Sequence, residues 1–326
     1  MPLDPSLAAV RLAVRRSLVD VGDPVLVACS GGPDSLALLA AAVFERRRTP
    51  GRVVGVSVDH GLQQGSHERA EAVVAQMGTL GADETVGVRV RVDSSGQGPE
   101  AAAREARYAV LEEVSRRFGR APVLLGHTLD DQAETVLLGL ARGSGARSLA
   151  GMRRGFGPFR RPLLEVTRAQ TVAACRAEGI EWWADPHNED PRFTRARVRH
   201  RVLPLLEAEL GPGVAAALAR TADRLDEDTT TLDRIAEAAF GELRREDGGY
   251  PTGDLAALLP AIRSRVVRLA ALHAGCPPSE LFRVHVLALV DLAAGTERAK
   301  QAQLPGHVTA YRDGDLLRFR RTAVPG

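Results

Sequence analysis

Cysteine is scarce in this chain of 326 residues: Cys29, Cys175 and Cys276 are far apart and odd in number. A disulfide framework and a Cys-x-x-Cys metal or redox site are both excluded. The chain also lacks an apolar run long enough to span a membrane, and its first residues lack the basic-then-apolar order of a secretory signal. We therefore expect a cytoplasmic protein without a membrane partner.

Lysine is nearly absent, since Lys300 is the single one. A site upstream of it that holds phosphate must use arginine, histidine, backbone amides or a metal ion. The net charge of +2 conceals an uneven distribution: between Gly139 and Leu206 thirteen arginines stand against six acids, and positions 192–201 hold five arginines and no acid. A basic stripe of this kind is typical of a surface that contacts nucleic acid.

The first half of the chain alternates short β-branched runs with stretches of helical periodicity, which is the pattern of βαβ units on a parallel sheet. We expect strands at 25–28, 53–58, 85–92 and 123–125. We expect helices at 7–18, 34–47, 67–80, 100–117, 130–141, 168–178 and 194–210. Together these elements predict a doubly wound α/β fold with a parallel sheet.

The sequence Gly-Pro-Gly-Val at 211–214 predicts a joint between two domains. The first domain, at 1–212, contains the βαβ units and an arginine-rich segment at 185–210. The second, at 213–326, has helical periodicity and ends in a hairpin signal, Asp313-Gly314. We therefore expect a smaller, mainly helical second domain with a short hairpin tail.

Positions 30–35, with the sequence SGGPDS, join the first predicted strand to the next helix. Two glycines let the backbone approach an anion, and the start of the helix directs free amides at it. Asp34 beside phosphate is explained if it holds a magnesium ion that bridges to a nucleotide. The alternative is a tight turn with Asp34 as an ordinary helix-start acid. The candidate nucleotide-binding residues are Ser30, Gly31, Gly32, Pro33, Asp34 and Ser35.

A cluster of acids follows the fourth predicted strand, in the sequence HTLDDQAET at 127–135. Asp130, Asp131 and Glu134 lie within about one helical turn, so their oxygens can converge. They could coordinate magnesium and seat a cationic substrate. The alternative is a capping box between Thr128 and Asp131, which needs no function.

Two smaller groups are consistent with the same edge of the sheet. Asp59 and His60 close the second predicted strand, where ligands bind in this architecture, although a strand-ending turn explains them equally well. Arg104 and Arg107 share a face of the helix at 100–117, where they could neutralise a nucleotide or simply form a solvated face.

The hexapeptide SGGPDS resembles the PP-loop of the N-type ATP pyrophosphatases, which transfer AMP from ATP to an oxygen of the substrate. Three further motifs follow it in the order of one family: VDHGL at 58–62, AREARY at 103–108 and HTLDDQAET. DPHNED at 185–190 and Arg197-x-Arg199 come next. Over about residues 22–210 the chain therefore resembles the tRNA(Ile)-lysidine synthetases.

The resemblance implies a ligase that acts on the wobble cytidine of the isoleucine tRNA with a CAU anticodon. ATP would adenylate the carbonyl oxygen on carbon 2 of the cytosine and release pyrophosphate. Free lysine would then displace AMP, so that lysidine forms and decoding switches from AUG to AUA. The resemblance also implies ATP and Mg²⁺ as cofactors, a tRNA-binding second domain and a homodimer.

Roles for individual residues also come from the resemblance. Positions 30–35 would hold the ATP phosphates, and Asp34 and Asp131 would hold Mg²⁺. Further nucleotide contacts would come from His60, Arg104 and His127. The implied catalytic set is Asp34, Asp130, Asp131, Glu134 and Arg107. The implied tRNA-binding set is Arg192, Arg195, Arg197, Arg199 and Arg201, which would bind phosphate.

Two positions depart from the family pattern: Gln63 stands where arginine is common and Ala196 where asparagine is usual. Three rival functions also stay open. A tRNA thiolase would need paired reactive cysteines or a metal cluster. A nucleotide-gated RNA-binding protein would need no catalysis, and an amidating ligase of the same superfamily would leave the arginine-rich segment unexplained.

Overall fold

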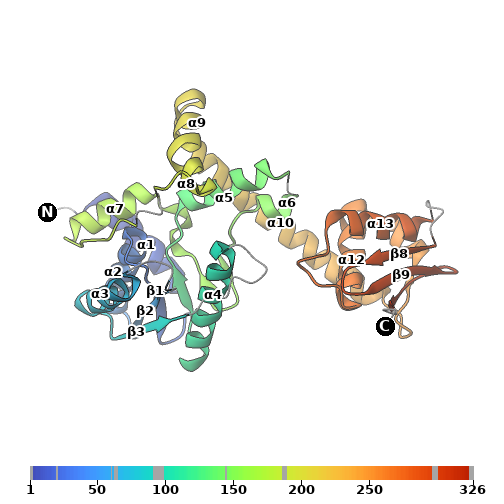
Figure 1. Cartoon of the computed structure of the whole chain (residues 1–326), viewed down its shortest axis with the longest axis horizontal. Coiled ribbons are helices and arrows are strands. Elements are labelled where there is room, and N and C mark those ends of the chain that lie inside the picture. The colour runs from blue at the N-terminus through green and yellow to red at the C-terminus, as the bar shows by residue number, and fades with distance from the viewer. Residues whose placement is uncertain are drawn as a thin grey trace. The chain divides into compact units, whose positions relative to one another are not determined.

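The protein is described here by a computed structural model, in which the chain divides into two units, Met1–Asp226 and Glu227–Gly326 (Figure 1). The structure describes residues 3–19, 21–59, 61, 65–90, 99–143, 145–185, 189–295 and 300–322. Each unit has its own hydrophobic core.

The first unit is built on a six-stranded sheet with the strand order β3-β2-β1-β4-β6-β5. Its strands are β1 (Val25–Ala28), β2 (Val53–Asp59), β3 (Glu84–Arg89), β4 (Val123–Leu125), β5 (Gly155–Phe156) and β6 (Phe159–Arg160). Neighbouring strands run parallel, except that β5 is antiparallel to β6. Since parallel strands end at one edge, the loops after β1, β2 and β4 meet there.

Helices cover both faces of this sheet, as Figure 1 shows. Val25 and Val27 of β1 face a core with α1 (Pro5–Ser17), α2 (Pro33–Arg46), α3 (Ser66–Thr79) and α7 (Arg168–Ala177). Leu26 faces a second core with α4 (Pro99–Arg117). Successive strand residues point to opposite faces, so a strand that is apolar throughout must be buried on both. The predicted doubly wound α/β fold is confirmed.

The remaining helices of the first unit cross the carboxyl edge of the sheet or follow it. They are α5 (Leu129–Ala141), α6 (Ala146–Leu149), the 3-10 helix η1 (Pro162–Glu165), α8 (Thr194–Arg197), the π-helix η3 (Val198–Val202) and α9 (Leu203–Leu210). We predicted one helix at 194–210, and its centre is π-helical. Pro204 explains the change, because its ring would crowd the carbonyl of His200 in a regular α-helix and it has no amide to donate.

The second unit contains a four-stranded sheet in the order β7-β10-β9-β8, where we expected only a hairpin tail. The hairpin exists as β9 (Val308–Asp313) and β10 (Leu316–Arg321), but β7 (Tyr250–Pro251) and β8 (Gln301–Leu304) flank it. β7 has only two residues, and β8 contains no β-branched or aromatic residue, so neither segment has the length and composition that predict a strand. The helices of this unit are the second part of α10 (Val214–Leu243), α11 (Thr252–Ala257), α12 (Pro260–His273) and α13 (Arg283–Ala294).

The division between the units falls within α10, not at the joint that we expected at 212. The first turns of this helix belong to the first unit, since Ala215 and Leu218 pack against Leu203 and Val198. Ala222 is also fully buried. The Gly-Pro-Gly sequence therefore ends α9 and begins α10 without separating the units.

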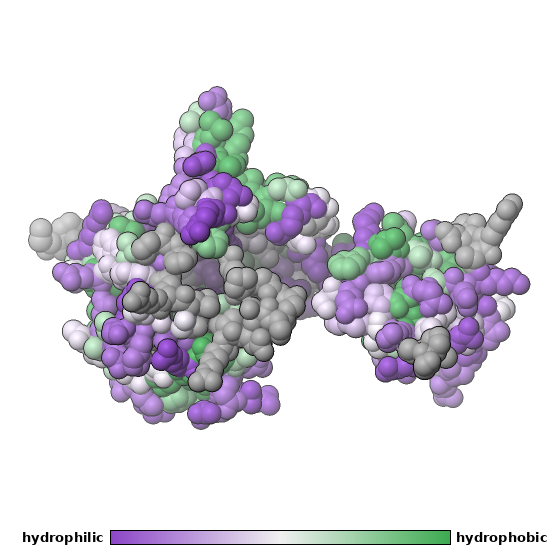
Figure 2. Space-filling model, in the orientation of Figure 1, coloured by the Kyte–Doolittle hydropathy of each residue, from purple (hydrophilic) through white to green (hydrophobic). Residues whose placement is uncertain are grey.

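Among the described residues, no single helix is long and apolar enough to cross a membrane. The helical segments 194–210 and 214–243 are together long and apolar enough, but the chain bends by 99° between them. Apolar atoms on the surface of α9, visible in Figure 2, contribute to that result, and Leu205 and Leu210 are exposed there.

Helix α3 packs so closely on the sheet that Gly55 of β2 has no room for a side chain. A Cβ added there would lie 2.6 Å from the sulfur of the buried Met77. We expect Gly55→Ala to lower the free energy of unfolding of the first unit by about 1–3 kcal/mol, because the tight contact forces the helix or the side chain to shift.

The measurement is urea unfolding followed by tryptophan fluorescence, since Trp182 and Trp183 both lie in the first unit. Gly78→Ala is the matched control, because a Cβ at that helical position would meet no atom within 4 Å. Equal urea midpoints for the two variants would contradict this account of the packing.

Candidate functional site

The loop at 30–35 is shaped by its serines and glycines. Ser35 Oγ donates to the carbonyl of Gly32 at 2.9 Å and accepts from the amide of Ser30 at 3.1 Å. Gly32 is the N-cap of α2 and has no side chain to cap the helix, which begins at Pro33. The first amides of α2 are therefore left without a side-chain cap, as an anion-binding helix start requires.

Gly31 holds the loop against its neighbours. Its φ of +82° favours glycine, and an added Cβ would lie 2.7 Å from Val73 Cγ2. Its carbonyl accepts from the amide of Trp183 at 3.1 Å, so a distant segment crosses the loop. Gly126, after β4, would place a Cβ 3.1 Å from the backbone of Asp34. The loops after β1 and β4 are thus in direct contact.

Three carboxylates converge beside this loop, one from Asp34 on α2 and two from Asp131 and Glu134 on α5. Arg168 Nη2 lies 2.9 Å from Asp34 Oδ2 and 3.7 Å from Asp131 Oδ1, so one guanidinium bridges two of them. The hydroxyl of Thr171 donates to Asp34. The first turns of α2, α5 and α7 therefore form one ionic cluster.

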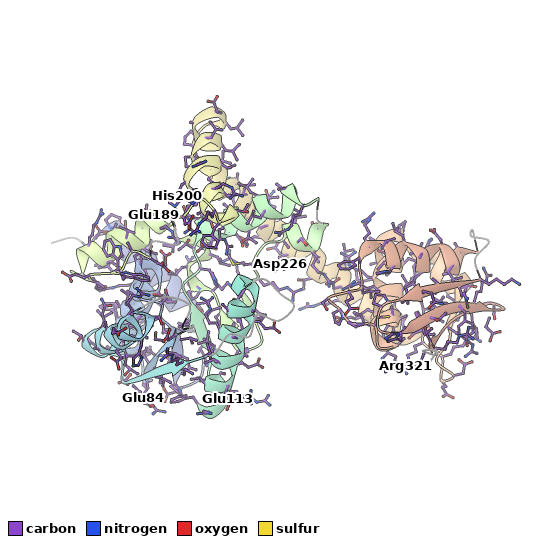
Figure 3. The ribbon with its side chains drawn as sticks, in the orientation of Figure 1. Glu84, Glu113, Glu189, His200, Asp226 and Arg321 are labelled. Atoms are coloured by element: carbon purple, nitrogen blue, oxygen red, sulfur yellow. The ribbon has the colours of Figure 1, made fainter. Side chains whose placement is uncertain are left out.

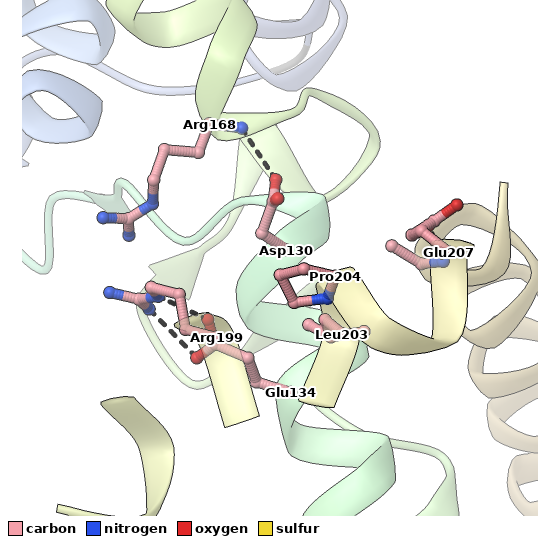
Figure 4. Close-up of a pocket in the computed structure, with 8 residues that line it drawn as sticks. Asp130, Glu134, Arg168, Arg199, Leu203, Pro204 and Glu207 are labelled. Atoms are coloured by element: carbon pink, nitrogen blue, oxygen red, sulfur yellow. Dashed lines mark hydrogen bonds and ion pairs between the residues drawn. The ribbon is translucent and has the colours of Figure 1, made fainter. Parts of the chain in front are cut away.

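The third carboxylate, Glu134, has no exposed side-chain surface and is held by two arginines. Arg199 contacts both of its oxygens, at 2.6 and 2.9 Å, and Arg195 Nε lies 3.1 Å away. Arg199 also reaches Asp131 Oδ1 at 3.0 Å. Figure 4 shows the guanidinium of Arg199 aimed at Glu134.

Burial and charge act against each other in these acids. Burial raises the pKa of Asp34 above its ordinary value, although Arg168 and Thr171 oppose it. Burial likewise raises the pKa of Glu134, against the effect of Arg199. For Asp131 the balance is reversed: burial acts to raise the pKa, but Arg168 and the Thr128 amide hold it below the ordinary value.

Asp131 forms the capping box that we held as the alternative, and it also takes part in the ionic cluster. Its Oδ2 accepts from the amide and hydroxyl of Thr128 at 2.9 and 3.0 Å, which completes the capping box of α5. Its Oδ1 faces Arg168 and Arg199 instead. One oxygen therefore fixes the helix start, and the other remains for a cation.

Asp130 does not join the ionic cluster. Its Oδ2 accepts from the backbone amide of Arg168 at 2.7 Å, which ties α5 to the first turn of α7 (Figure 4). Asp130 does line a pocket of about 180 Å³ that Glu134 shares. The other lining residues are Arg168, Arg199, Leu203, Pro204, Glu207 and Ala215. The pocket thus combines charges of both signs with an apolar wall.

Three further residues to which the resemblance gave nucleotide or catalytic roles are His127, which follows β4, and Arg104 and Arg107 on α4. Nδ1 of the half-buried His127 accepts from Arg161 Nε at 3.1 Å, and Arg161 Nη2 donates to the Tyr108 hydroxyl at 3.2 Å. Arg107 and the exposed Arg104 stand over the ring of Tyr108. His60 lies outside the described residues. Asp59 accepts a hydrogen bond from the Gly61 amide, as expected for the strand-ending turn that was the alternative to a ligand site.

The five arginines predicted to bind tRNA divide into two groups. Arg195 and Arg199 point into the acidic cluster, as above. Arg192 is exposed but paired with Asp190, and Arg201 is exposed. Arg197 Nη1 donates to the carbonyls of Pro191 and Arg192. Glu189 and His200, from the same region, lie on the opposite side of the unit from Glu84, at the amino end of β3 (Figure 3).

Arg168 and Thr171 were not predicted as site residues, although both contact Asp34. Only their place in a helix could be predicted from the sequence, since Thr167 caps α7. Arg161, which is buried beside His127, was likewise given no role. Among the described residues, no group of three or more His, Cys, Asp or Glu side chains is arranged to hold a metal ion.

His127 makes the first unit sensitive to acid. Burial and the nearby arginines lower its pKa to about 3, against the pull of Asp131. In the unfolded chain histidine titrates near 6.5, so the unfolded state binds more protons between these values. The stability that neutral His127 contributes is present above pH 6.5 or so and is lost as pH falls toward 3.

We expect His127→Asn, which keeps an acceptor for Arg161 without titrating, to lose less unfolding free energy than the wild type between about pH 7 and 4.5. Urea unfolding followed by tryptophan fluorescence measures this loss. His67→Asn, at an exposed position, should follow the wild type. Equal losses for His127→Asn and the wild type would contradict the assignment.

Comparison with known proteins agrees with the observed fold. A family model described as a PP-loop domain matches residues 11–206. Among solved structures, a tRNA thiolase from Methanococcus maripaludis has a similar fold, with a TM-score of 0.58 over 68% of this chain and 78% of that one, at 19% identity. The thiolase shows the likeness of fold alone.

The curated relatives match nearly the whole chain. The tRNA(Ile)-lysidine synthase of Salinispora arenicola is 53% identical and covers 97% of this chain and 96% of its own length. That of Thermobifida fusca is 51% identical, with 96% and 97% covered. That of Streptomyces coelicolor is 47% identical, with 97% and 99% covered. With a PP-loop model over more than half of its length and these relatives over nearly all of it, the chain belongs to the tRNA(Ile)-lysidine synthase family.

Proposed function

We propose that this protein ligates free lysine to carbon 2 of the wobble cytidine in the isoleucine tRNA with a CAU anticodon, and converts ATP to AMP and pyrophosphate. The observation that carries the proposal is the buried acidic cluster of Asp34, Asp131 and Glu134, held by arginines directly beside the phosphate loop. The proposed nucleotide site and the proposed cation site would thus be adjacent, as the two steps of this ligation need. The names of the relatives supply the identity of the RNA.

In the first step the carbonyl oxygen on carbon 2 of the cytosine attacks the α-phosphorus of ATP. A carbon–oxygen–phosphorus linkage forms, and the bond to the β-phosphate oxygen breaks as pyrophosphate leaves. The loop at 30–35 and the start of α2 would hold the phosphates, because their amides face an anion at little reorganisation cost. Positioning of the two reactants supplies most of the remaining assistance.

Asp34 and Asp131 would hold Mg²⁺. One guanidinium of Arg168 already spans their oxygens, at 2.9 and 3.7 Å, so the two carboxylates are close enough to share a cation. Carboxylate oxygens are the ligands that magnesium prefers, with waters and phosphates completing its shell. When bound there, the ion would neutralise charge on the phosphates.

In the second step the side-chain amine of lysine attacks carbon 2, a carbon–nitrogen bond forms, and AMP leaves with the former carbonyl oxygen. Lysine would first bind as an ammonium ion and would then pass one proton to the carboxylate that holds it, because only the neutral amine can attack carbon 2. Glu134 suits this task, because a fully buried carboxylate requires a cation and its present partners, Arg195 and Arg199, are themselves cations that an ammonium can replace.

Contact with tRNA phosphates would fall to the arginine-rich segment. Arg192 and Arg201 are exposed, whereas Arg195 and Arg199 are engaged with Glu134. RNA binding by these residues, binding of tRNA by the second unit and assembly as a homodimer remain predictions.

The rival thiolase chemistry fits the cysteines poorly. Burial raises the pKa of Cys29 to about 12, and burial with the nearby Asp34 raises that of Cys175 to about 12. Neither thiol forms the thiolate that sulfur transfer needs at neutral pH.

The proposal is tested by incubating the full chain with ATP, Mg²⁺, labelled lysine and a transcript of the isoleucine tRNA with a CAU anticodon. Pyrophosphate release and label in the RNA are both expected. A transcript with uridine at the wobble position should give neither. Release without incorporation would move the second step to another nucleophile, and the absence of release would overturn the proposal.

Asp34→Asn is the matched variant for this assay. We expect it to reduce pyrophosphate release by about a hundredfold or more, because it removes one charge from the cation site beside the phosphates. Its RNA affinity, measured by filter binding, should stay as in the wild type. Full turnover by this variant would contradict the role of Asp34.

Glu134→Gln separates the two steps. We expect the KM for lysine to rise about ten- to hundredfold, because the neutral amide cannot pair with an ammonium, while lysine-independent pyrophosphate release changes less than about threefold. Equal losses in both steps would place Glu134 in the first step instead.

A further inference from the structure

Arg104, Arg107 and Arg161 gather at an aromatic cluster. The resemblance implied a nucleotide contact for Arg104 and a catalytic role for Arg107, but neither residue has a part in the two steps described above. The rings belong to Tyr108 on α4 and to Phe156 and Phe159 on β5 and β6, with centroids 4.9–5.8 Å apart. Arg161 stands 4.7 Å over the ring of Phe156, and Arg104 stands 5.2 Å over Tyr108. In a chain that is only 4% aromatic, this is a concentrated group.

The cluster carries positive charge that the protein does not balance. Arg104, Arg107 and Arg161 find no carboxylate within ion-pair distance in the described part of the chain, and their polar partners are the Tyr108 hydroxyl, His127 and a backbone carbonyl. Nε of Arg107 is buried without any hydrogen-bond partner. Uncompensated guanidinium groups with an unpaired donor are a site for an anion.

The rings give the site a second property. Phe156 is 37% exposed and lies on β5, the strand at the edge of the sheet. An exposed aromatic ring next to arginines is the combination on which unpaired nucleic acid bases stack while their phosphates are neutralised. A nucleotide bound to a rigid protein surface needs both parts.

The position of the cluster favours RNA over ATP. The phosphate loop follows β1, whereas the cluster is formed by α4 and by β5 and β6, which lie beyond β4 in the sheet. Arg161 connects the two regions, because it contacts His127 at the carboxyl end of β4. A nucleotide held here would lie beside the reacting groups without occupying the loop at 30–35.

We propose that the cluster of Tyr108, Phe156, Arg104, Arg107 and Arg161 binds one unstacked nucleotide of a single-stranded RNA loop, with its base on Phe156 and its phosphate on the arginines. The inference rests on the proposed function, which supplies an RNA substrate with an anticodon loop. Splaying that loop out is required before a wobble base can be modified.

The experiment uses the full chain and an RNA hairpin with the CAU anticodon loop. Phe156→Ala should weaken its binding about tenfold, and Phe156→Trp should restore most of the affinity, because it again offers a stacking face. Arg104→Gln should lower the slope of log Kd against log salt by about one. Leu12→Ala, an exposed apolar truncation on α1, is the control and should bind as the wild type.

Two further measurements identify the ligand. Hairpins with 5-iodopyrimidines at single loop positions should photo-crosslink to the peptide that contains Phe156 or Tyr108. ATP affinity, measured by equilibrium dialysis, should be unchanged in Phe156→Ala. Unchanged RNA affinity in Phe156→Ala, failure of Phe156→Trp to restore it, or loss of ATP affinity instead would overturn the inference. Phe156-dependent RNA binding without lysine incorporation would sustain it and refute the proposed function.

Discussion

The carboxylate of Glu134 has no contact with solvent. The need to pair it with cations is the main constraint on the first unit. An ionised carboxylate loses several kcal/mol of hydration when it is buried, so it persists only with cations at hydrogen-bond distance. Arg195 and Arg199 supply them, and both come from a segment about sixty residues further along the chain. The path of that segment across α5 follows from this requirement.

The same requirement explains why α2, α5 and α7 begin at one point. Asp34 and Asp131 are partly withdrawn from water, and Arg168 lies between them. Helix starts attract carboxylates through their free amides, but three carboxylates together repel one another until a cation intervenes. Under the proposed function, a metal ion or an ammonium ion would take the place of these arginines, so folding and ligand binding would depend on the same electrostatic requirement.

Features of the first unit that depend on neighbouring residues in the sequence could be predicted. Contacts between residues far apart in the sequence could not. The strand, loop and helix around Gly31 and Asp34 were predictable because burial, turn chemistry and helix capping are local. Asp131 and Glu134 were predictable for the same reason, as neighbours on one helical turn. Arg168 was not, because nothing in its own surroundings distinguishes it from a solvated helix-start residue. Its importance comes from a partner more than a hundred positions away.

Two other differences between the predictions and the structure also arise from contacts between distant segments. β7 has two residues and β8 lacks β-branched and aromatic side chains, so their strand pairing depends on the edges that β10 and β9 offer them. Arg195 and Arg199 have the composition of an RNA-binding surface, yet in the structure they serve as counter-ions. Charge alone fixes the sign of a partner, and only the fold decides whether that partner is a carboxylate of the same chain or a phosphate.

The preference for arginine has a practical consequence. Every cation of the ionic cluster is a guanidinium, and the chain's one lysine, Lys300, is exposed in the second unit at the start of β8. Amine-directed reagents, which acylate lysine but not arginine, therefore find no target among the site residues. A dye or surface anchor attached at Lys300 would mark a position in the second unit and leave the ionic cluster chemically intact, and the α-amino group of the chain is the other amine that such reagents acylate.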